Sequence, residues 1–300
     1  MHRPTYLKAG DKVRIISTAR KVTPEDMDKA ASILNEWGLQ VVFGNNLFED
    51  NHQFAGTDAQ RAADLQAAID DPHCKAIFCA RGGYGSMRII NAVNWSNIIS
   101  SPKWLIGFSD ISVLLFRLYY LGIESIHGIM PGLFSKDKAG DSVDMLRRLL
   151  FSGPEPITAP ESEFSRHGEA SGRLVGGNLS MISIMEGTSF NVPSVSNILF
   201  IEDLDEYLYH VDRMMVHLKL SGVLESLAGL VVGQMSGMND NPIPFGKQAY
   251  QIIHEHVKEY QYPVGYNFNI GHDYPNHPVI HGAKCTLKVT SEGNAKLSFD

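Results

Sequence analysis

The segment Gly107-Phe108-Ser109-Asp110 places a serine directly after a short apolar run, where its hydroxyl could act as a nucleophile. A serine between a strand and a helix is typical of a nucleophile elbow, whose sharp turn exposes the side chain. Gly107 matches the glycine expected two positions before the serine, but Ile111 stands where a second glycine is expected. A Ser-Asp pair is also a common helix N-cap, so these residues leave both interpretations open.

A second candidate segment, Arg81-Gly82-Gly83-Tyr84-Gly85, follows the apolar run 76–79. Its glycines leave backbone N–H groups free to point at an anion, either a phosphate or an oxyanion. The segment lacks both the G-x-G-x-x-G order and the lysine of a P-loop, so a nucleotide-binding fingerprint is not supported. A tight turn that needs positive φ explains the same glycines, and this alternative stays open.

A serine nucleophile needs a base, and the base needs an acid that orients it. His272 follows the apolar run 264–270, but the chain has 12 histidines, so residue type alone does not single it out. A run of acidic residues from Glu202 to Glu206 follows the apolar run 199–201. A solvated acidic loop is the commoner role of such a run.

Strands that alternate with helices should position these residues. Thr23 followed by Pro24 predicts the start of a helix that stops at Gly38, and Thr57 with Gln60 predicts a capping box. The alternation predicts βαβ units and a Rossmann-like or flavodoxin-like parallel sheet, with ligands at the carboxyl ends of its strands. The strands expected in this half are 13–17, 41–43, 76–79, 104–108 and 123–126.

The pattern changes after about residue 151. We expect an N-terminal α/β domain over residues 1–152, a linker rich in Pro, Ser, Gly and acids over 153–168, and a smaller mixed α/β domain over 169–300. In the second half we expect strands at 198–201, 230–232 and 264–270, helices at 211–220 and 247–257, and a hairpin formed by 286–289 and 295–299.

Composition excludes several classes of protein. The chain has 300 residues, 44% of them hydrophobic, and a formal net charge of −7. An acidic chain without a basic run is a poor nucleic-acid binder. The best apolar stretch, 105–116, is too short to span a membrane and contains Asp110.

Three features predict a cytoplasmic protein with free thiols and without a metal. Cys74, Cys79 and Cys285 lack metal-ligand spacing, and the first residues lack the apolar core of a secretory signal. His277 and His281 are four residues apart, but they lie in a proline-broken loop. No carboxylates or cysteines cluster beside these histidines in the sequence, so we expect no metal site there.

Five motifs, taken in their order, resemble the LD-carboxypeptidase family of serine peptidases, which includes muramoyltetrapeptide carboxypeptidases and microcin C self-immunity peptidases. The resemblance covers about residues 10–290. It implies that Ser109 is the nucleophile, that His272 is the base, and that Glu202 orients the base. It also implies a site at the interface between a catalytic N-terminal domain and a smaller C-terminal domain that supplies Glu and His. The motifs are 81–85, 107–110, 176–179, 199–203 and Gly271-His272.

The resemblance implies hydrolysis of the L,D-peptide bond before the terminal D-alanine of a murein tetrapeptide, in the recycling of cell-wall peptides. No cofactor is expected, because the nucleophile is the protein's own. Two alternatives stay open: an immunity-type peptidase that cleaves peptide–nucleotide conjugates, and a non-catalytic module that binds a sugar or a nucleotide. A homodimer is the expected assembly.

The chemistry also needs groups that bind the oxyanion and the substrate. We expect the backbone N–H groups of Asp110 and Gly83 to bind the oxyanion. An arginine is expected at the terminal carboxylate, because a guanidinium binds a carboxylate bidentately. For Arg213, an ordinary surface position is the alternative. Residues 17–20 depart from the Pro-Ser of related sequences, so no contact can be carried over there. The residues expected to contact the substrate are Arg81, Tyr84, Asn178 and Arg213.

Overall fold

The computed structural model describes residues 1–193 and 196–300. The chain forms two compact units, Met1–Pro154 with Pro278–Ile280, and Glu155–His277 with His281–Asp300. The expected domain boundaries, with a linker at 153–168, remain a prediction. That segment contains strand β6 (Ile157–Ala159), which pairs with β13 (Ala295–Phe299).

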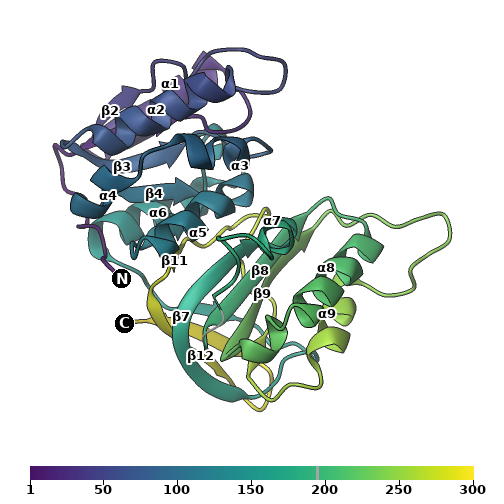
Figure 1. The fold of residues 1–300 in the computed structure, drawn as a ribbon. Helices are drawn as coiled ribbons and strands as arrows, with labels where there is room; N and C mark the ends of the chain where they lie inside the picture. The colour runs from purple at the N-terminus through teal and green to yellow at the C-terminus, as the bar shows by residue number, and fades with distance from the viewer. Residues whose placement is uncertain (194–195) are drawn as a thin grey trace. The chain divides into compact units, whose positions relative to one another are not determined.

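The first unit is built on a six-stranded sheet with the order β11-β5-β4-β3-β1-β2 (Figure 1). Strands β1 to β5 pair in parallel. The order 2-1-3-4-5 is that of flavodoxin-like doubly wound folds, so the predicted parallel α/β architecture is confirmed. The strands are β1 (Lys12–Ile16), β2 (Gln40–Phe43), β3 (Cys74–Cys79), β4 (Trp104–Gly107), β5 (Ser125–His127) and β11 (Val279–His281).

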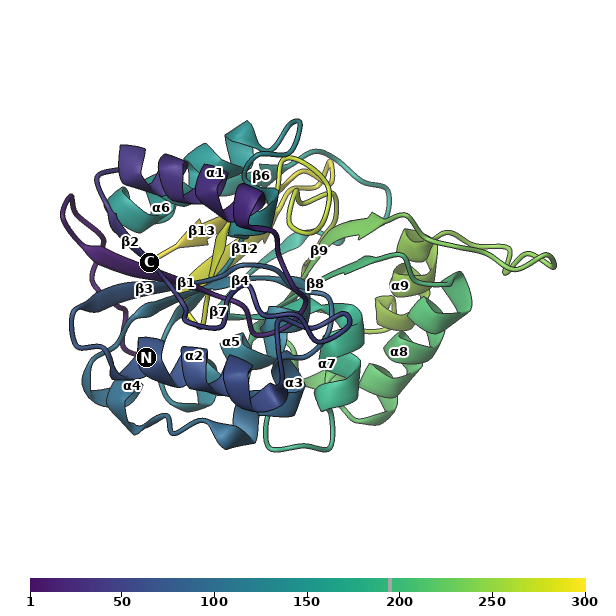
Figure 2. The same cartoon turned by 90° about the horizontal axis from the view of Figure 1, so that it is seen from above.

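Helices cover both faces of this sheet. Helices α1 and α6 lie on one face, and α2 to α5 lie on the other (Figure 2). The predicted helix starts are confirmed: the Thr23 side chain accepts from the Asp26 N–H, and Thr57 and Gln60 form both bonds of a capping box. The elements are α1 (Pro24–Glu36), α2 (Asp58–Asp70), α3 (Ser86–Ile89), η1 (Ile90–Ala92), α4 (Ser96–Ser100), η2 (Ser109–Ile111), α5 (Ser112–Tyr120), η3 (Pro131–Leu133) and α6 (Gly140–Ser152).

The second unit is built on a seven-stranded mixed sheet with the order β10-β9-β8-β7-β12-β13-β6. Strands β7 to β10 pair in parallel, whereas β7, β12, β13 and β6 pair antiparallel. The predicted hairpin near the C-terminus is therefore confirmed. The further elements are β7 (Gly168–Asn178), α7 (Leu179–Met185), β8 (Ile198–Leu204), α8 (Leu208–Leu220), η4 (Leu224–Ser226), β9 (Gly229–Ser236), α9 (Ala249–Val257), β10 (Val264–Gly265) and β12 (Lys284–Val289).

The predicted strand over 264–270 is wrong beyond its first two residues, because β10 ends at Gly265. Tyr266, Phe268 and Ile270 are all fully buried, which explains the apolar pattern. Asn267, however, has φ +63°, so the backbone leaves the extended conformation there. Burial of every second residue in this loop therefore gives the same apolar alternation that a strand would show.

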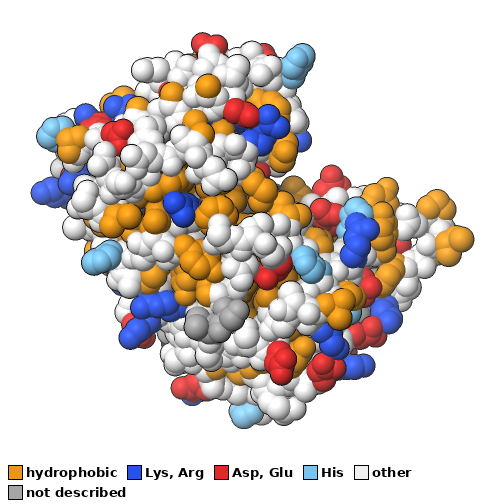
Figure 3. Space-filling model, viewed as in Figure 1, with side chains coloured by type: hydrophobic (Ala, Val, Ile, Leu, Met, Phe, Trp, Pro, Cys, Tyr) orange, Lys and Arg blue, Asp and Glu red, His pale blue; other side chains and the backbone are white. Residues whose placement is uncertain are grey.

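The surface is mixed in character. On the face shown in Figure 3, acidic, basic and hydrophobic side chains are interspersed. Among the helices that the structure describes, none is long and apolar enough to cross a membrane.

Candidate active site

Ser109 is the first residue of η2, in the sharp turn between β4 and α5. Its φ is +64°, in the left-handed region that a non-glycine residue adopts only at some energetic cost. Such a backbone is the mark of a nucleophile elbow. Within residues 1–193, neither η2 nor α5 receives a side-chain cap. The N-cap interpretation of Ser109 is therefore wrong.

Gly107 and Ile111 explain why one glycine suffices for this elbow. A Cβ at Gly107 would lie 2.8 Å from Cγ2 of Ile111. Ile111, which replaces the second glycine of the usual pattern, thus packs directly against the bare Cα of the first. The half-matched motif still forms the turn, because the isoleucine fills the space that Gly107 leaves open.

The glycine-rich loop after β3 lies beside the elbow. A Cβ at Gly82 would lie 3.3 Å from the Ser109 Cβ and 3.3 Å from the Phe108 carbonyl oxygen. Gly83 and Gly85 have φ of +107° and +142°. Glycine therefore serves here both for close approach and for positive φ.

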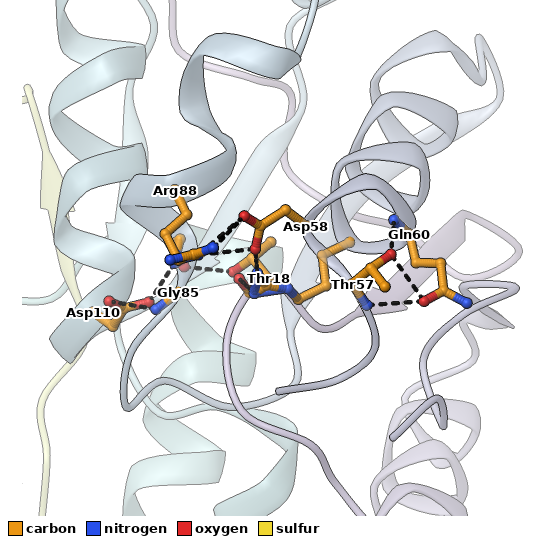
Figure 4. A network of polar contacts seen from close by, with 9 residues as sticks. Thr18, Thr57, Asp58, Gln60, Gly85, Arg88 and Asp110 are labelled. Carbon is orange, nitrogen blue, oxygen red and sulfur yellow. Dashed lines mark hydrogen bonds and ion pairs between the residues drawn. The ribbon is translucent and has the colours of Figure 1, made fainter. Parts of the chain in front are cut away.

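Asp110 fixes this loop to the elbow. Its carboxylate is 2% exposed and accepts hydrogen bonds from the backbone N–H of Ser86 at 2.9 Å and of Gly85 at 3.3 Å (Figure 4). Burial raises the pKa of Asp110, although these hydrogen bonds act in the opposite direction. The residue after the serine is thus a tether between the carboxyl ends of β3 and β4.

A further network of polar contacts stabilises the glycine-rich loop after β3 (Figure 4). Arg61 is 1% exposed, pairs with Asp58 and donates to the Thr18 carbonyl at 3.4 Å. The Thr18 and Ser86 hydroxyls are 2.7 Å apart. Arg88 also binds Asp58, at 2.7 Å, and its hydrogen bond and that of Arg61 lower the pKa of Asp58 to about 2. The loops after β1 and β3 are thereby joined.

In the second unit, Glu202 and His272 form a buried pair. Glu202 Oε2 lies 2.7 Å from His272 Nδ1, and the side chains are 0% and 12% exposed. Burial alone would lower the pKa of His272. The charge of Glu202 and its hydrogen bond outweigh burial, so the pKa lies above its ordinary value. A carboxylate at Nδ1 favours the tautomer with the proton on Nδ1, in which Nε2 carries the lone pair that can accept a proton.

Two glycines allow the histidine loop to lie against the end of β8. Gly271 has φ +143°, and a Cβ there would lie 3.2 Å from the Glu202 Cβ. A Cβ at Gly233 on β9 would lie 3.3 Å from the same atom and 2.3 Å from the Ile270 carbonyl oxygen. Larger residues at either position would push the imidazole away from its carboxylate.

Two residues that the sequence analysis missed hold this loop. Gln234 accepts from the Asp273 N–H at 2.8 Å and donates to the Pro275 carbonyl at 3.2 Å. The Ser236 hydroxyl donates to the Asp273 carboxylate at 2.6 Å. Both residues follow the apolar run 230–232, and that position at a strand end is the signal that could have identified them.

Asn178 caps α7 and binds Asp203. Its Oδ1 accepts from the Met181 N–H at 3.3 Å, and its Nδ2 donates to Asp203 Oδ1 at 2.8 Å. Asp203 is 1% exposed and also accepts from the Ser180 N–H at 2.9 Å. Burial and the nearby charge of Glu202 raise the pKa of Asp203 to about 7. The expected contact between Asn178 and substrate stays a prediction.

Replacing Asn178 should separate these two structural roles. We expect Asn178→Ala to lower the free energy of unfolding by about 1–2 kcal/mol, through loss of the cap and of the bond to Asp203. Asp is as good a cap as Asn, but Asn178→Asp would remove the amide donor and add charge beside Asp203, so it should cost at least as much. Urea unfolding measures the stability of both variants. If Asn178→Asp did not change the free energy of unfolding, the bond to Asp203 would contribute nothing, and the cap would be the one structural role of Asn178.

The other predicted binding residues are surface-exposed. Arg81 and Gly83 are exposed in the glycine-rich loop, and Tyr84 is 47% exposed, with its ring centroid 6.0 Å from that of Phe54. Arg213 is exposed on α8, 5.5 Å from the Tyr209 ring centroid. Their contacts with substrate stay predictions, as does the oxyanion role of Gly83 and Asp110. Among the described residues, no group of three His, Cys, Asp or Glu side chains is arranged to hold a metal.

A serine in an elbow and a buried Glu–His pair are the parts of a serine-type hydrolase. Residues 13–128 match the LD-carboxypeptidase N-terminal domain, and residues 171–287 match the LD-carboxypeptidase C-terminal domain. The chain belongs to the LD-carboxypeptidase family.

Similar proteins agree with this assignment. A probable murein peptide carboxypeptidase of Bacillus subtilis is 34% identical over 304 residues, which cover 97% of this chain and 93% of that protein. The crystal structure of a muramoyltetrapeptide carboxypeptidase from Oxalobacter formigenes matches with a TM-score of 0.88 at 24% identity, covering 96% of this chain and 98% of the other. A microcin C7 self-immunity protein in complex with aspartyl sulfamoyl adenosine matches with a TM-score of 0.87 at 19% identity, covering 98% of each chain. Both structural matches show a common fold.

Proposed function

We propose that this protein is an LD-carboxypeptidase that removes the terminal D-alanine from murein tetrapeptides. The observation that supports this choice of substrate is the 34% identity, along nearly the whole chain, to a protein named for murein peptides. Membership of the family favours a hydrolase over a non-catalytic binding module. The remaining support comes from the geometry of Ser109 and of the Glu202–His272 pair.

In the proposed reaction, Ser109 Oγ attacks the carbonyl carbon of the L,D bond, and His272 Nε2 takes the hydroxyl proton. The tetrahedral intermediate collapses when His272 passes that proton to the nitrogen of D-alanine, which leaves. Water then attacks the acyl-enzyme with His272 again as the base, releasing the tripeptide and restoring Ser109. Glu202 holds the imidazole tautomer and stabilises the imidazolium.

The oxyanion of the intermediate is assigned to the backbone N–H groups of Asp110 and Gly83. Ser109 lies at the start of η2, so the N–H of Asp110 belongs to the first helical turn, where donors are least used by the helix itself. Gly83 follows Gly82, which lies against the Ser109 Cβ. Each donor in such a site contributes roughly 3–4 kcal/mol to transition-state stabilisation.

The proposed substrate can be tested by mass spectrometry of purified murein tetrapeptides incubated with the protein. We expect loss of a single alanine from the D-alanyl peptide and no loss from its L-alanyl diastereomer. A peptide–nucleotide conjugate in a parallel incubation tests the immunity-type alternative. Cleavage of the conjugate alone would overturn the murein proposal. If neither compound were cleaved, this protein, although a member of the family, would lack the proposed activity.

We also propose a cytoplasmic homodimer. The three cysteines are all buried and unpaired, which fits a reducing compartment. The dimer is proposed because two-fold dimers are by far the commonest assembly among soluble oligomers. Light scattering coupled to size exclusion would contradict the dimer if it gave the 33.2 kDa mass of one chain.

A further inference from the structure

The segment after β1 lies at the place where a doubly wound sheet binds ligands. The chain leaves β1 toward β2 on one side, whereas β3 lies on the other side of β1. Such a reversal of strand order opens a crevice at the carboxyl ends of the two strands. Residues 17–20 leave β1 here, and the glycine-rich loop leaves β3. The segment that departs from the family pattern is thus part of this crevice.

Backbone contacts hold Arg20 firmly in this position. Its N–H donates to the Gly82 carbonyl at 3.4 Å, and its carbonyl accepts from the Ser17 hydroxyl at 2.7 Å. Arg20 also forms a β-bridge with Phe54. An arginine anchored in this way loses little backbone freedom when it binds a ligand.

The Arg20 side chain lies over the glycine-rich loop. A Cβ at Gly83 would lie 2.5 Å from Arg20 Cδ and 2.7 Å from Nε, so the arginine side chain as placed here lies directly over the bare Cα of this glycine. Gly82, the preceding residue, lies against the Ser109 Cβ. Two consecutive glycines of the first unit therefore lie between the Arg20 side chain and Ser109: Gly83 beside the arginine and Gly82 beside the serine.

Arg20 is exposed, and its guanidinium has no acidic partner in the part of the chain that the structure describes. The neighbouring arginines differ: Arg61 and Arg88 are both paired with Asp58. Arg81 leaves the loop on another side, since its Cβ is 3.9 Å from a Cβ built at Gly132. Arg20 thus places a positive charge, without an acidic partner among the described residues, over the glycine-rich loop whose Gly82 lies against the Ser109 Cβ.

We propose that Arg20 binds the terminal carboxylate of the substrate and so selects a free C-terminus. This inference rests on the proposed function, because a carboxypeptidase cleaves the bond one residue from that carboxylate. A guanidinium fork binds both oxygens of a carboxylate, whereas a lysine offers a single point charge. Arg20 would act as a specificity residue and take no part in proton transfer.

The test compares a tetrapeptide that ends in free D-alanine with the same peptide ending in D-alanine amide. We expect Arg20→Ala to reduce kcat/KM for the free acid about 30- to 100-fold, mostly through KM, and to leave the amide almost unchanged. Arg20→Lys should recover part of the loss. Lys21→Ala is the matched control, because it removes a positive charge one residue away that pairs with exposed Asp50.

The outcomes separate this inference from the proposed function. If the unmodified protein cleaves the acid, and Arg20→Ala keeps the same preference for acid over amide, the carboxylate role is wrong. If Lys21→Ala loses the preference equally, the effect is general charge and the assignment to Arg20 also fails. If the unmodified protein cleaves neither peptide, the proposed substrate itself is wrong, and the inference falls with it.

Discussion

Ser109→Ala is expected to reduce kcat for release of D-alanine by about 10⁶-fold, to a residual rate supplied by binding and oxyanion stabilisation alone. In the proposed reaction the Ser109 Oγ is the atom that forms the acyl-enzyme, and the methyl group of alanine cannot replace it. Alanine keeps the Cβ, so the cost of φ +64° is the same in both proteins and the fold should be retained. Mass spectrometry of the tetrapeptide, sampled over hours, measures the loss.

The matched control for this variant is Ser100→Ala. Ser100 lies at the end of α4, and its hydroxyl donates to the Asn97 carbonyl of the same helix at 3.1 Å. We expect its kcat to stay within about 2-fold of the unmodified enzyme, as for most surface substitutions. Equal activity of Ser109→Ala and the unmodified protein would show that the elbow has no covalent role.

Local chemistry in the sequence was sufficient to predict much of the first unit. The caps at Thr23 and Thr57 depend on residues within one helical turn, so their pattern is visible without tertiary context. The alternation of strands and helices likewise predicted the parallel sheet. Gly107 fits the elbow, which was one of two interpretations that the local pattern left open, and the place of Ile111 depends on its contact with that glycine.

Contacts between distant residues could not be predicted in the same way. Glu202 and His272 are 70 residues apart, and family resemblance rather than periodicity connected them. The role of Asn178 as a cap that binds Asp203 depends on β7 and β8 being neighbours. In the sequence, Arg20 belongs to a segment that departs from the Pro-Ser of related sequences, and nothing local indicates that its side chain lies over Gly83. Burial misled the strand prediction at 264–270, because buried loop residues are as apolar as strand residues.

Glu202→Gln is expected to reduce kcat/KM about 10³- to 10⁴-fold, because the amide can present its NH₂ group to Nδ1 and so favour the wrong tautomer. It should also change the pH profile. The base must be neutral, so kcat/KM rises as the pH passes through the pKa of His272. That pKa lies above the ordinary value of about 6.5 in the unmodified protein. Without the Glu202 charge, burial of the imidazole remains, so the midpoint of the acid limb should move to lower pH.

The chain offers a second Glu–His pair as the control for this variant. Glu206 Oε2 lies 2.8 Å from His210 Nδ1, but both side chains are partly exposed, at 24% and 30%. Solvent screens that pair, so Glu206→Gln should leave kcat/KM within about 2-fold and the midpoint unchanged. If Glu202→Gln lowered the rate without moving the midpoint, His272 would not be the group that titrates in the acid limb. The two variants therefore distinguish an orienting acid from a carboxylate that only fills the core.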